Sequence, residues 1–146
     1  MNTTLLCMVL ILTAPAPKGP LKKNSSLVGE WSVKTQTYDG RTTAVERNHV
    51  CIFLVDGSYG SRADKNGKIF WQRYTSDDSA SPPSLDIIAS DPSPGEDIIG
   101  EFIYKVDGDT LTICLGEKGS GRPRLIDASQ GSKNMILTLK RIKPKE

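Results

Sequence analysis

The chain has 146 residues, the length of one domain and enough to bury a core without disulfide or metal cross-links. Its 19 basic and 17 acidic residues are interspersed along the sequence and give a formal net charge of +2. This balance, without a basic stripe among aromatic residues, argues against a nucleic-acid-binding domain.

The N-terminal residues differ in composition from the rest. Residues 5–12 form an unbroken apolar run, which ends at a segment rich in alanine and proline. The run is too short to span a bilayer, which takes about 20 apolar residues, but it is typical of the apolar part of a secretory signal. We therefore predict a signal peptide over 1–16, a linker over 17–26, and export to the periplasm or the cell exterior. The alternative is a frayed tail, because no Lys or Arg precedes the run.

The remainder, residues 27–144, reads as one all-β domain. Apolar and polar residues alternate over short stretches, and turn signals such as Asp39-Gly40, Asp56-Gly57 and Asn66-Gly67 separate them. Almost no helical periodicity is present. In chain order we predict strands over 27–38, 49–55, 58–63, 68–75, 85–89, 98–106, 109–115 and 134–142.

Residues 98–115 give the clearest prediction, a β-hairpin. Asp107-Gly108 is typical of a two-residue type I′ turn, and counting outward from it pairs Tyr104 with Leu111 and Phe102 with Ile113. One face is then almost wholly apolar and the other mostly polar, as in an antiparallel sheet with one face in water.

About eight short strands without crossover helices favour a single antiparallel up-and-down barrel, because closure removes exposed sheet edges. In the last strand Leu137 and Leu139 belong to the inward-facing set, and Arg141 continues it. If the first and last strands pair antiparallel, Arg141 lies close to Trp31. A guanidinium over an indole ring contributes about 0.5–2 kcal/mol, so we expect this pair to cap one rim of the barrel.

These residues carry a resemblance to known proteins. The Gly29-Glu30-Trp31 opening, with Arg141 late in the last strand, resembles lipocalin-like barrels, in which an arginine packs over the tryptophan. A longer resemblance, over roughly 27–144, is to a family of small, mostly exported planctomycete-type bacterial domains of unknown function. It implies a lipocalin-like fold and export, and it assigns no activity. The blocks that carry it are 27–31, 83–88, 99–104, 106–115, Arg122-Pro123 and 137–141.

Few residues form a catalytic or metal-binding pattern. His49 is the only histidine and precedes an apolar strand, and no serine lies in a Gly-x-Ser-x-Gly elbow. Cys51 and Cys114 lack the spacing of zinc ligands. Export would permit a disulfide between them, but their predicted strands and faces favour two unpaired thiols. We therefore predict no catalytic residue, no metal site and no cofactor.

Asp86 is the one candidate functional carboxylate. It lies inside a short predicted strand, in a block that carries the family resemblance. The other candidates lie in turns and polar loops, namely Asp77-Asp78, Asp91, Glu96-Asp97, Asp107 and Asp109. Two interpretations stay open, namely a buried member of a polar network and a functional residue at the barrel mouth.

The barrel interior is the other candidate site, with Trp31, Phe102, Tyr104 and Arg141 as its predicted ligand-binding residues. Eight strands enclose a space that side chains fill or that one small ligand occupies. The bulky predicted lining favours a filled core with at most a narrow pocket.

The sequence thus favours a monomeric, non-catalytic extracytoplasmic module that binds a small apolar ligand or an envelope protein, without nucleic acid or an integral membrane span. One alternative is an enzyme that uses carboxylates at the barrel mouth. The other is a structural or inhibitor-like module whose loops, residues 76–84, 90–97 and 116–133, carry recognition.

Overall fold

The computed structural model describes residues 26–64, 66–90 and 98–145. The predicted signal peptide, nearly all of the predicted linker and residues 91–97 lie outside this range. The described residues form strands and no helix, and therefore no helix long and apolar enough to cross a membrane. The strands are β1 (Gly29–Tyr38), β2 (Arg41–Ala44), β3 (Val50–Phe53), β4 (Ser58–Arg62), β5 (Phe70–Asp77), β6 (Ser84–Ile88), β7 (Ile98–Asp107), β8 (Thr110–Leu115) and β9 (Met135–Arg141).

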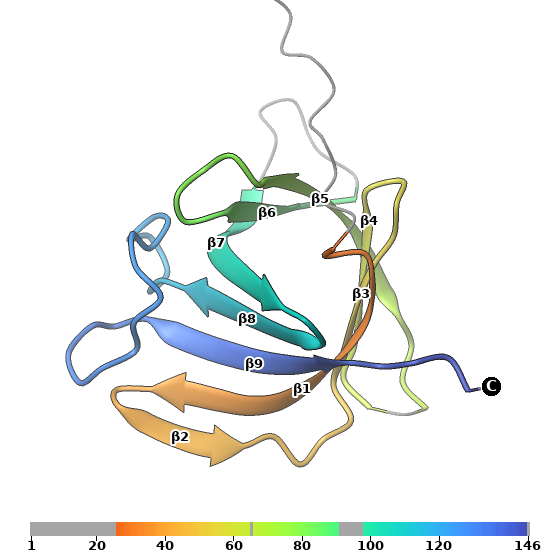
Figure 1. The fold of residues 1–146 in the computed structure, drawn as a ribbon, viewed down its shortest axis with the longest axis horizontal. Coiled ribbons are helices and arrows are strands. Elements are labelled where there is room, and N and C mark those ends of the chain that lie inside the picture. Colours follow the sequence, from red (N-terminus) through yellow and green to blue (C-terminus); the bar gives the residue numbers. More distant parts are fainter. Residues whose placement is uncertain (1–25, 65, 91–97, 146) are drawn as a thin grey trace, which may run out of the picture.

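The strands form a closed antiparallel barrel, which confirms the predicted fold class. From β3 to β9 each strand pairs with the next one in the chain, β3 also pairs with β1, and β1 pairs with β9 to close the ring (Figure 1). Eight strands make up this ring. The ninth, β2, is an extra strand beside the second half of β1.

The sequence did not indicate β2, because all four of its side chains are exposed and none shows an apolar alternation. It pairs with Thr35–Tyr38, whereas β3 pairs with Gly29–Ser32 on the same edge of β1. The chain between β2 and β3 stays attached to β1 at two points. The amide of Val45 donates to Lys34 O at 2.8 Å, and the amide of Val33 donates to His49 O at 2.9 Å.

The β7–β8 hairpin has the predicted faces but not the predicted register. Asp107 pairs with Thr110, so the two-residue loop is Gly108-Asp109 rather than Asp107-Gly108. Only Gly108 of the two has a positive φ (56°), which is typical of a type II′ turn. Every partner moves by two residues along β8, and Tyr104 faces Ile113 instead of Leu111. An even shift leaves each side chain on its predicted face.

Arg141 and Trp31 meet at one end of the barrel, as the sequence predicts. They are Cα partners across β1 and β9, and the guanidinium carbon lies 4.0 Å from the indole centroid. The guanidinium also donates to Val28 O at 2.8 Å and to Ser26 O at 2.6 Å, while the indole N–H of Trp31 donates to Leu27 O at 2.9 Å. The segment before β1 is therefore folded across this end of the barrel, which becomes the closed end.

Gly29 is required at this place. Its φ is +135°, and a Cβ there would lie 2.7 Å from Nη1 of Arg141. A side chain at position 29 would therefore displace the guanidinium from the indole ring, which explains the Gly-x-Trp spacing physically.

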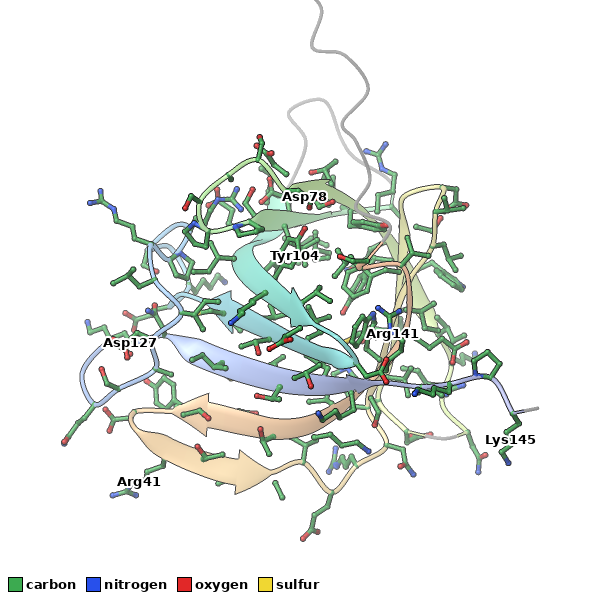
Figure 2. The ribbon with its side chains drawn as sticks, viewed as in Figure 1. Arg41, Asp78, Tyr104, Asp127, Arg141 and Lys145 are labelled. Atoms are coloured by element: carbon green, nitrogen blue, oxygen red, sulfur yellow. The ribbon has the colours of Figure 1, made fainter. Side chains whose placement is uncertain are left out.

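Aromatic rings fill the barrel toward the closed end. Trp31, Phe53, Tyr74 and Tyr104 are each at most 2% exposed and belong to one core cluster. The Tyr104 hydroxyl donates to the Asp78 carboxylate at 2.5 Å, from the β5–β6 loop over this end (Figure 2). The Tyr74 hydroxyl donates to a carbonyl of the β3–β4 turn at 2.9 Å. This half of the interior is a packed core, with its polar tips satisfied by loops.

The outer face of the β7–β8 hairpin is buried at Ile103 and Cys114, where the sequence predicted a face in water, while Glu101 and Lys105 on the same face are exposed as predicted. Ile103 and Cys114 point outward and are Cα partners, yet they are 1% and 0% exposed. The long β8–β9 connection covers them, with Ala128 also buried and Leu125 O 3.7 Å from the Cys114 sulfur. The amide of Gly40, in the β1–β2 turn, donates to Ala128 O at 2.7 Å and holds the connection in place. The alternation of apolar and polar residues predicted which side chains point inward and which point outward. It did not predict that the β8–β9 connection covers Ile103 and Cys114.

Replacement of Arg141 with Met should lower the free energy of unfolding by about 2–3 kcal/mol, because the cation–π contact and two hydrogen bonds from a charged group are lost. Urea denaturation followed by tryptophan fluorescence measures this. Lys140→Met, an exposed position in the same strand, is the matched control and should change stability by less than about 0.5 kcal/mol. Equal effects of the two substitutions would contradict the capping role.

Cys51 and Cys114 are unpaired and buried, and burial raises the pKa of both thiols. In a Cys7→Ser background, both should react far more slowly with a thiol reagent in the folded protein than in urea. The reaction should stay slow up to about pH 8.5, where an ordinary thiol is half ionised. Rapid reaction of either thiol in the native protein would contradict the burial.

Candidate functional site

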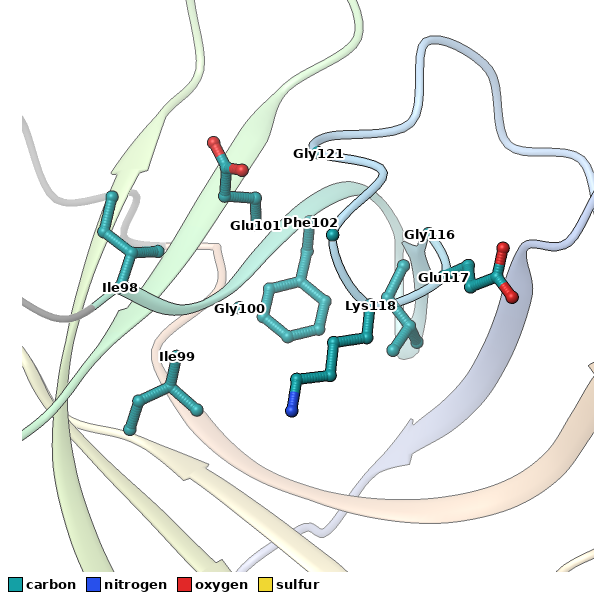
Figure 3. A pocket seen from close by; sticks show the side chains of 11 residues that line it. Ile98, Ile99, Gly100, Glu101, Phe102, Gly116, Glu117, Lys118 and Gly121 are labelled. Carbon is teal, nitrogen blue, oxygen red and sulfur yellow. The ribbon is translucent and has the colours of Figure 1, made fainter.

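A pocket of about 710 Å³ lies where β7 begins and β8 ends, at the end of the barrel opposite Trp31 and Arg141. Figure 3 shows this pocket from close by. It opens between the start of β7 and the glycine-rich segment that follows β8. This mouth pocket is lined by Ile98, Ile99, Gly100, Glu101, Phe102, Leu115, Gly116, Glu117, Lys118, Gly119 and Gly121.

A β-bulge at the start of β7 shapes one wall of the mouth pocket. Ile98 pairs with Ile88 and Gly100 pairs with Ile87, so Ile99 is an extra residue without a partner on β6. A Cβ on Gly100 would lie 2.4 Å from the Phe102 ring, so only glycine lets the ring lie along the strand. The wall thus consists of an aromatic ring and a half-exposed isoleucine. Two successive isoleucines before a glycine break the strand alternation, and this was the sequence signal of the bulge.

The other wall is a hydrogen-bonded turn at residues 117–120. The amide and hydroxyl of Ser120 both donate to Glu117 O, at 2.9 and 2.6 Å. A Cβ on Gly116 would lie 2.6 Å from the Ser120 hydroxyl, and Gly119 has a φ of +86°. Glycines therefore permit the close approach and the positive φ on which the turn depends. Lys118 lies at the tip of this turn.

Of the charged residues that line the mouth pocket, the two glutamates have cationic neighbours and the lysine has no anionic one among the described residues. Glu117 forms an ion pair with Lys133 at 3.5 Å, and Glu101 lies 3.6 Å from Arg122. Lys118 forms no hydrogen bond or ion pair with any residue that the structure describes. In Figure 3 the Phe102 ring, Ile99 and Lys118 surround the same space, whereas Glu101 and Glu117 point away from it.

The four residues predicted to bind a ligand are divided between the two ends of the barrel. Phe102 lines the mouth pocket. Trp31, Tyr104 and Arg141 lie in or around the packed core of the closed end, where hydrogen bonds to backbone or loop groups fasten them. Leu115, also expected in the interior lining, faces Phe102 across β7 and β8 and lines the pocket with it.

Asp86 lies on the outer face of the barrel and not at its mouth. Its carboxylate accepts a hydrogen bond from Arg122 at 2.7 Å, and the same guanidinium donates to Phe102 O at 2.9 Å. Glu101 is the Cα partner of Asp86 across β6 and β7 and lies 3.6 Å from Arg122. Arg122 thus attaches the β8–β9 connection to two strands, and the ion pair explains Asp86 as a member of a polar network.

A second, shallower pocket of about 410 Å³ lies beside Arg122, between the β5–β6 loop and the β8–β9 connection. Asp86 lines neither pocket. The second pocket is lined by Ala80, Ser81, Pro82, Ser84, Ile103, Arg122, Pro123 and Arg124.

His49 lies beside Ser61, with 3.1 Å between its Nε2 and the serine hydroxyl. Burial lowers the pKa of His49, so the ring is neutral near pH 7. A serine nucleophile needs the histidine to be oriented by a third group, and no acidic side chain of the described chain hydrogen-bonds to His49. The described residues also contain no group of three or more His, Cys, Asp or Glu side chains that could hold a metal ion.

Comparison of the chain with protein-family models, with curated proteins and with solved structures gives no match. The pockets, charges and contacts of the chain itself therefore have to indicate its function.

Replacement of Arg122 with Met should lower the free energy of unfolding by about 1–3 kcal/mol, because Asp86 loses its ion-pair partner in a half-buried place. Arg124→Met is a matched control, since Arg124 is exposed and forms no contact of this kind with a described residue. Its effect should stay below about 0.5 kcal/mol. Chemical denaturation of both variants measures the difference, and equal stabilities would show that Arg122 does not fasten the connection.

Proposed function

We propose that the protein is a non-catalytic, extracytoplasmic lipocalin-like module that binds a small apolar ligand in the mouth pocket. The observation that carries this proposal is a pocket of about 710 Å³ with an aromatic and aliphatic wall, at the end opposite the packed, capped one. Sites for small ligands are concave, mostly apolar and typically about 300–1,000 Å³.

The apolar surface at this end supports the proposal. Ile98 and Ile99 are 49% and 54% exposed, although they open a strand that runs into the core. Phe102 is folded back along its strand, with one side of its ring toward the core and the pocket beside it. Apolar surface that a folded protein leaves around a concavity is typical of a binding site.

The contacts of the candidate catalytic groups favour binding over catalysis. Asp86 is held by Arg122 outside the barrel, at a place that lines neither pocket. His49 and Ser61 lack an orienting carboxylate among the described residues and do not line the mouth pocket. The resemblance of the Gly29-Glu30-Trp31 opening and Arg141 to lipocalin-like barrels, and the signal-like N-terminus, are consistent with an exported binding protein.

The neutral fluorophore N-phenyl-1-naphthylamine tests the proposal, because its emission increases in apolar surroundings. It should bind the wild-type protein saturably. Ile99→Asp should weaken its affinity by about tenfold, since a carboxylate beside the bound ring is unfavourable to bury. Val55→Asp, at an exposed position in the β3–β4 turn of the closed end, should leave the affinity unchanged.

Two outcomes would contradict the proposal. One is the absence of saturable binding to a protein that unfolds cooperatively. The other is an equal loss of affinity in the Ile99→Asp and Val55→Asp variants, which would place the fluorophore outside the mouth pocket.

A further inference from the structure

We infer that the ligand of the mouth pocket carries an anionic group, which pairs with Lys118 at the rim while its apolar part lies against Phe102 and Ile99. This inference rests on the proposed function and defines the chemical class of the ligand. It follows from three features of the described residues, namely the pairing of the charges, the turn that places the backbone of the lysine and the apolar character of the opposite wall.

The first feature is that the two acidic residues of the pocket lining already have cationic partners. Glu117 pairs with Lys133 at 3.5 Å, and Glu101 lies 3.6 Å from Arg122, which Asp86 also binds. Lys118 has no such partner among the described residues. Lys118 is therefore the charged residue of the described lining that has no ion-pair partner, and a ligand anion would provide one.

The second feature is the turn that carries Lys118. The amide and the hydroxyl of Ser120 both donate to Glu117 O, so the backbone of the two residues between them, Lys118 and Gly119, is restrained. The Glu117–Lys133 ion pair attaches the same turn to the segment before β9. The backbone of Lys118 is thus placed at the mouth before any ligand arrives, and its exposed side chain lines the pocket.

The third feature is the distribution of polarity across the pocket. The Phe102 ring and Ile99 lie on β7, whereas Lys118 approaches from the opposite turn (Figure 3). A ligand that spans the pocket therefore meets apolar surface at one end and a cation at the other. The ammonium group is a point charge that pairs with a sulfonate, carboxylate or phosphate alike. The structure thus points to an amphipathic anion of modest size.

Two fluorophores with the same aromatic ring system test the contribution of the anionic group to binding separately from that of the apolar part. N-Phenyl-1-naphthylamine is neutral, and 1-anilinonaphthalene-8-sulfonate is the same ring system with a sulfonate. The wild-type protein should bind the sulfonate about fivefold more tightly. Lys118→Met keeps the length and the apolar stem of the side chain and removes its charge. It should weaken sulfonate binding about fivefold, the size of a partly exposed ion pair, and leave the neutral fluorophore unaffected.

Lys105→Met is the matched control, because Lys105 is an exposed lysine on the outer face of β7 and not part of the pocket. It should change neither affinity. Raising the salt concentration to 0.5 M should reduce the preference for the sulfonate in the wild-type protein, as screening of an ion pair requires.

The outcomes separate the two claims. If neither fluorophore binds saturably, the proposed function fails and the inference fails with it. If both fluorophores bind with equal affinity and Lys118→Met changes neither affinity, the proposed binding of a ligand in the pocket stands and the inferred preference for an anion is wrong. If Lys105→Met weakens the sulfonate as much as Lys118→Met does, the attraction comes from general surface charge and the inference is overturned.

Discussion

Arg141 joins the end of the last strand to the start of the first strand and the segment before it, which are more than 100 residues away in the chain. Its guanidinium lies on the Trp31 ring, its N–H groups bind carbonyls of the segment before β1, and its backbone belongs to the strand that closes the barrel. An antiparallel sheet that did not close would leave two edges with unpaired amides and carbonyls. The cation–π contact stabilises the register in which these edges meet, and Gly29 leaves room for it.

The difference between the two ends of the barrel follows from this closure. Leu27 and the core aromatic residues fill the end beside Trp31, and the mouth pocket lies at the other end. There the β7 bulge and the turn at Lys118 stand apart, and the space between them is the mouth pocket. The Arg122 ion pair fixes the connection between β8 and β9, of which that turn is the first part. The residues that close the barrel and the residues of the proposed binding site thus lie on separate parts of it.

Strand periodicity predicted most of the fold and little of the site. The alternation in the strands and the inward register of Arg141 placed the closing pair correctly, because periodicity and register depend on local sequence. The strand β2 and the cover over Cys114 were missed, since neither has an apolar pattern of its own. Asp86 could not be assigned, because its partner is 36 residues away in the chain. The position of Lys118 depends on a turn. No sequence pattern was recognised that would predict the hydrogen bonds of this turn.

The pairing of β1 with β9 is the claim on which the rest depends, and NMR of the labelled protein tests it most directly. We expect an NOE between the α protons of Val33 and Leu139 and an amide NOE between Ser32 and Lys140 across the two strands, with the side-chain protons of Arg141 shifted upfield by the indole ring current of Trp31. A folded protein without these NOEs, and with Arg141 shifts at their ordinary values, would contradict the closed, capped barrel.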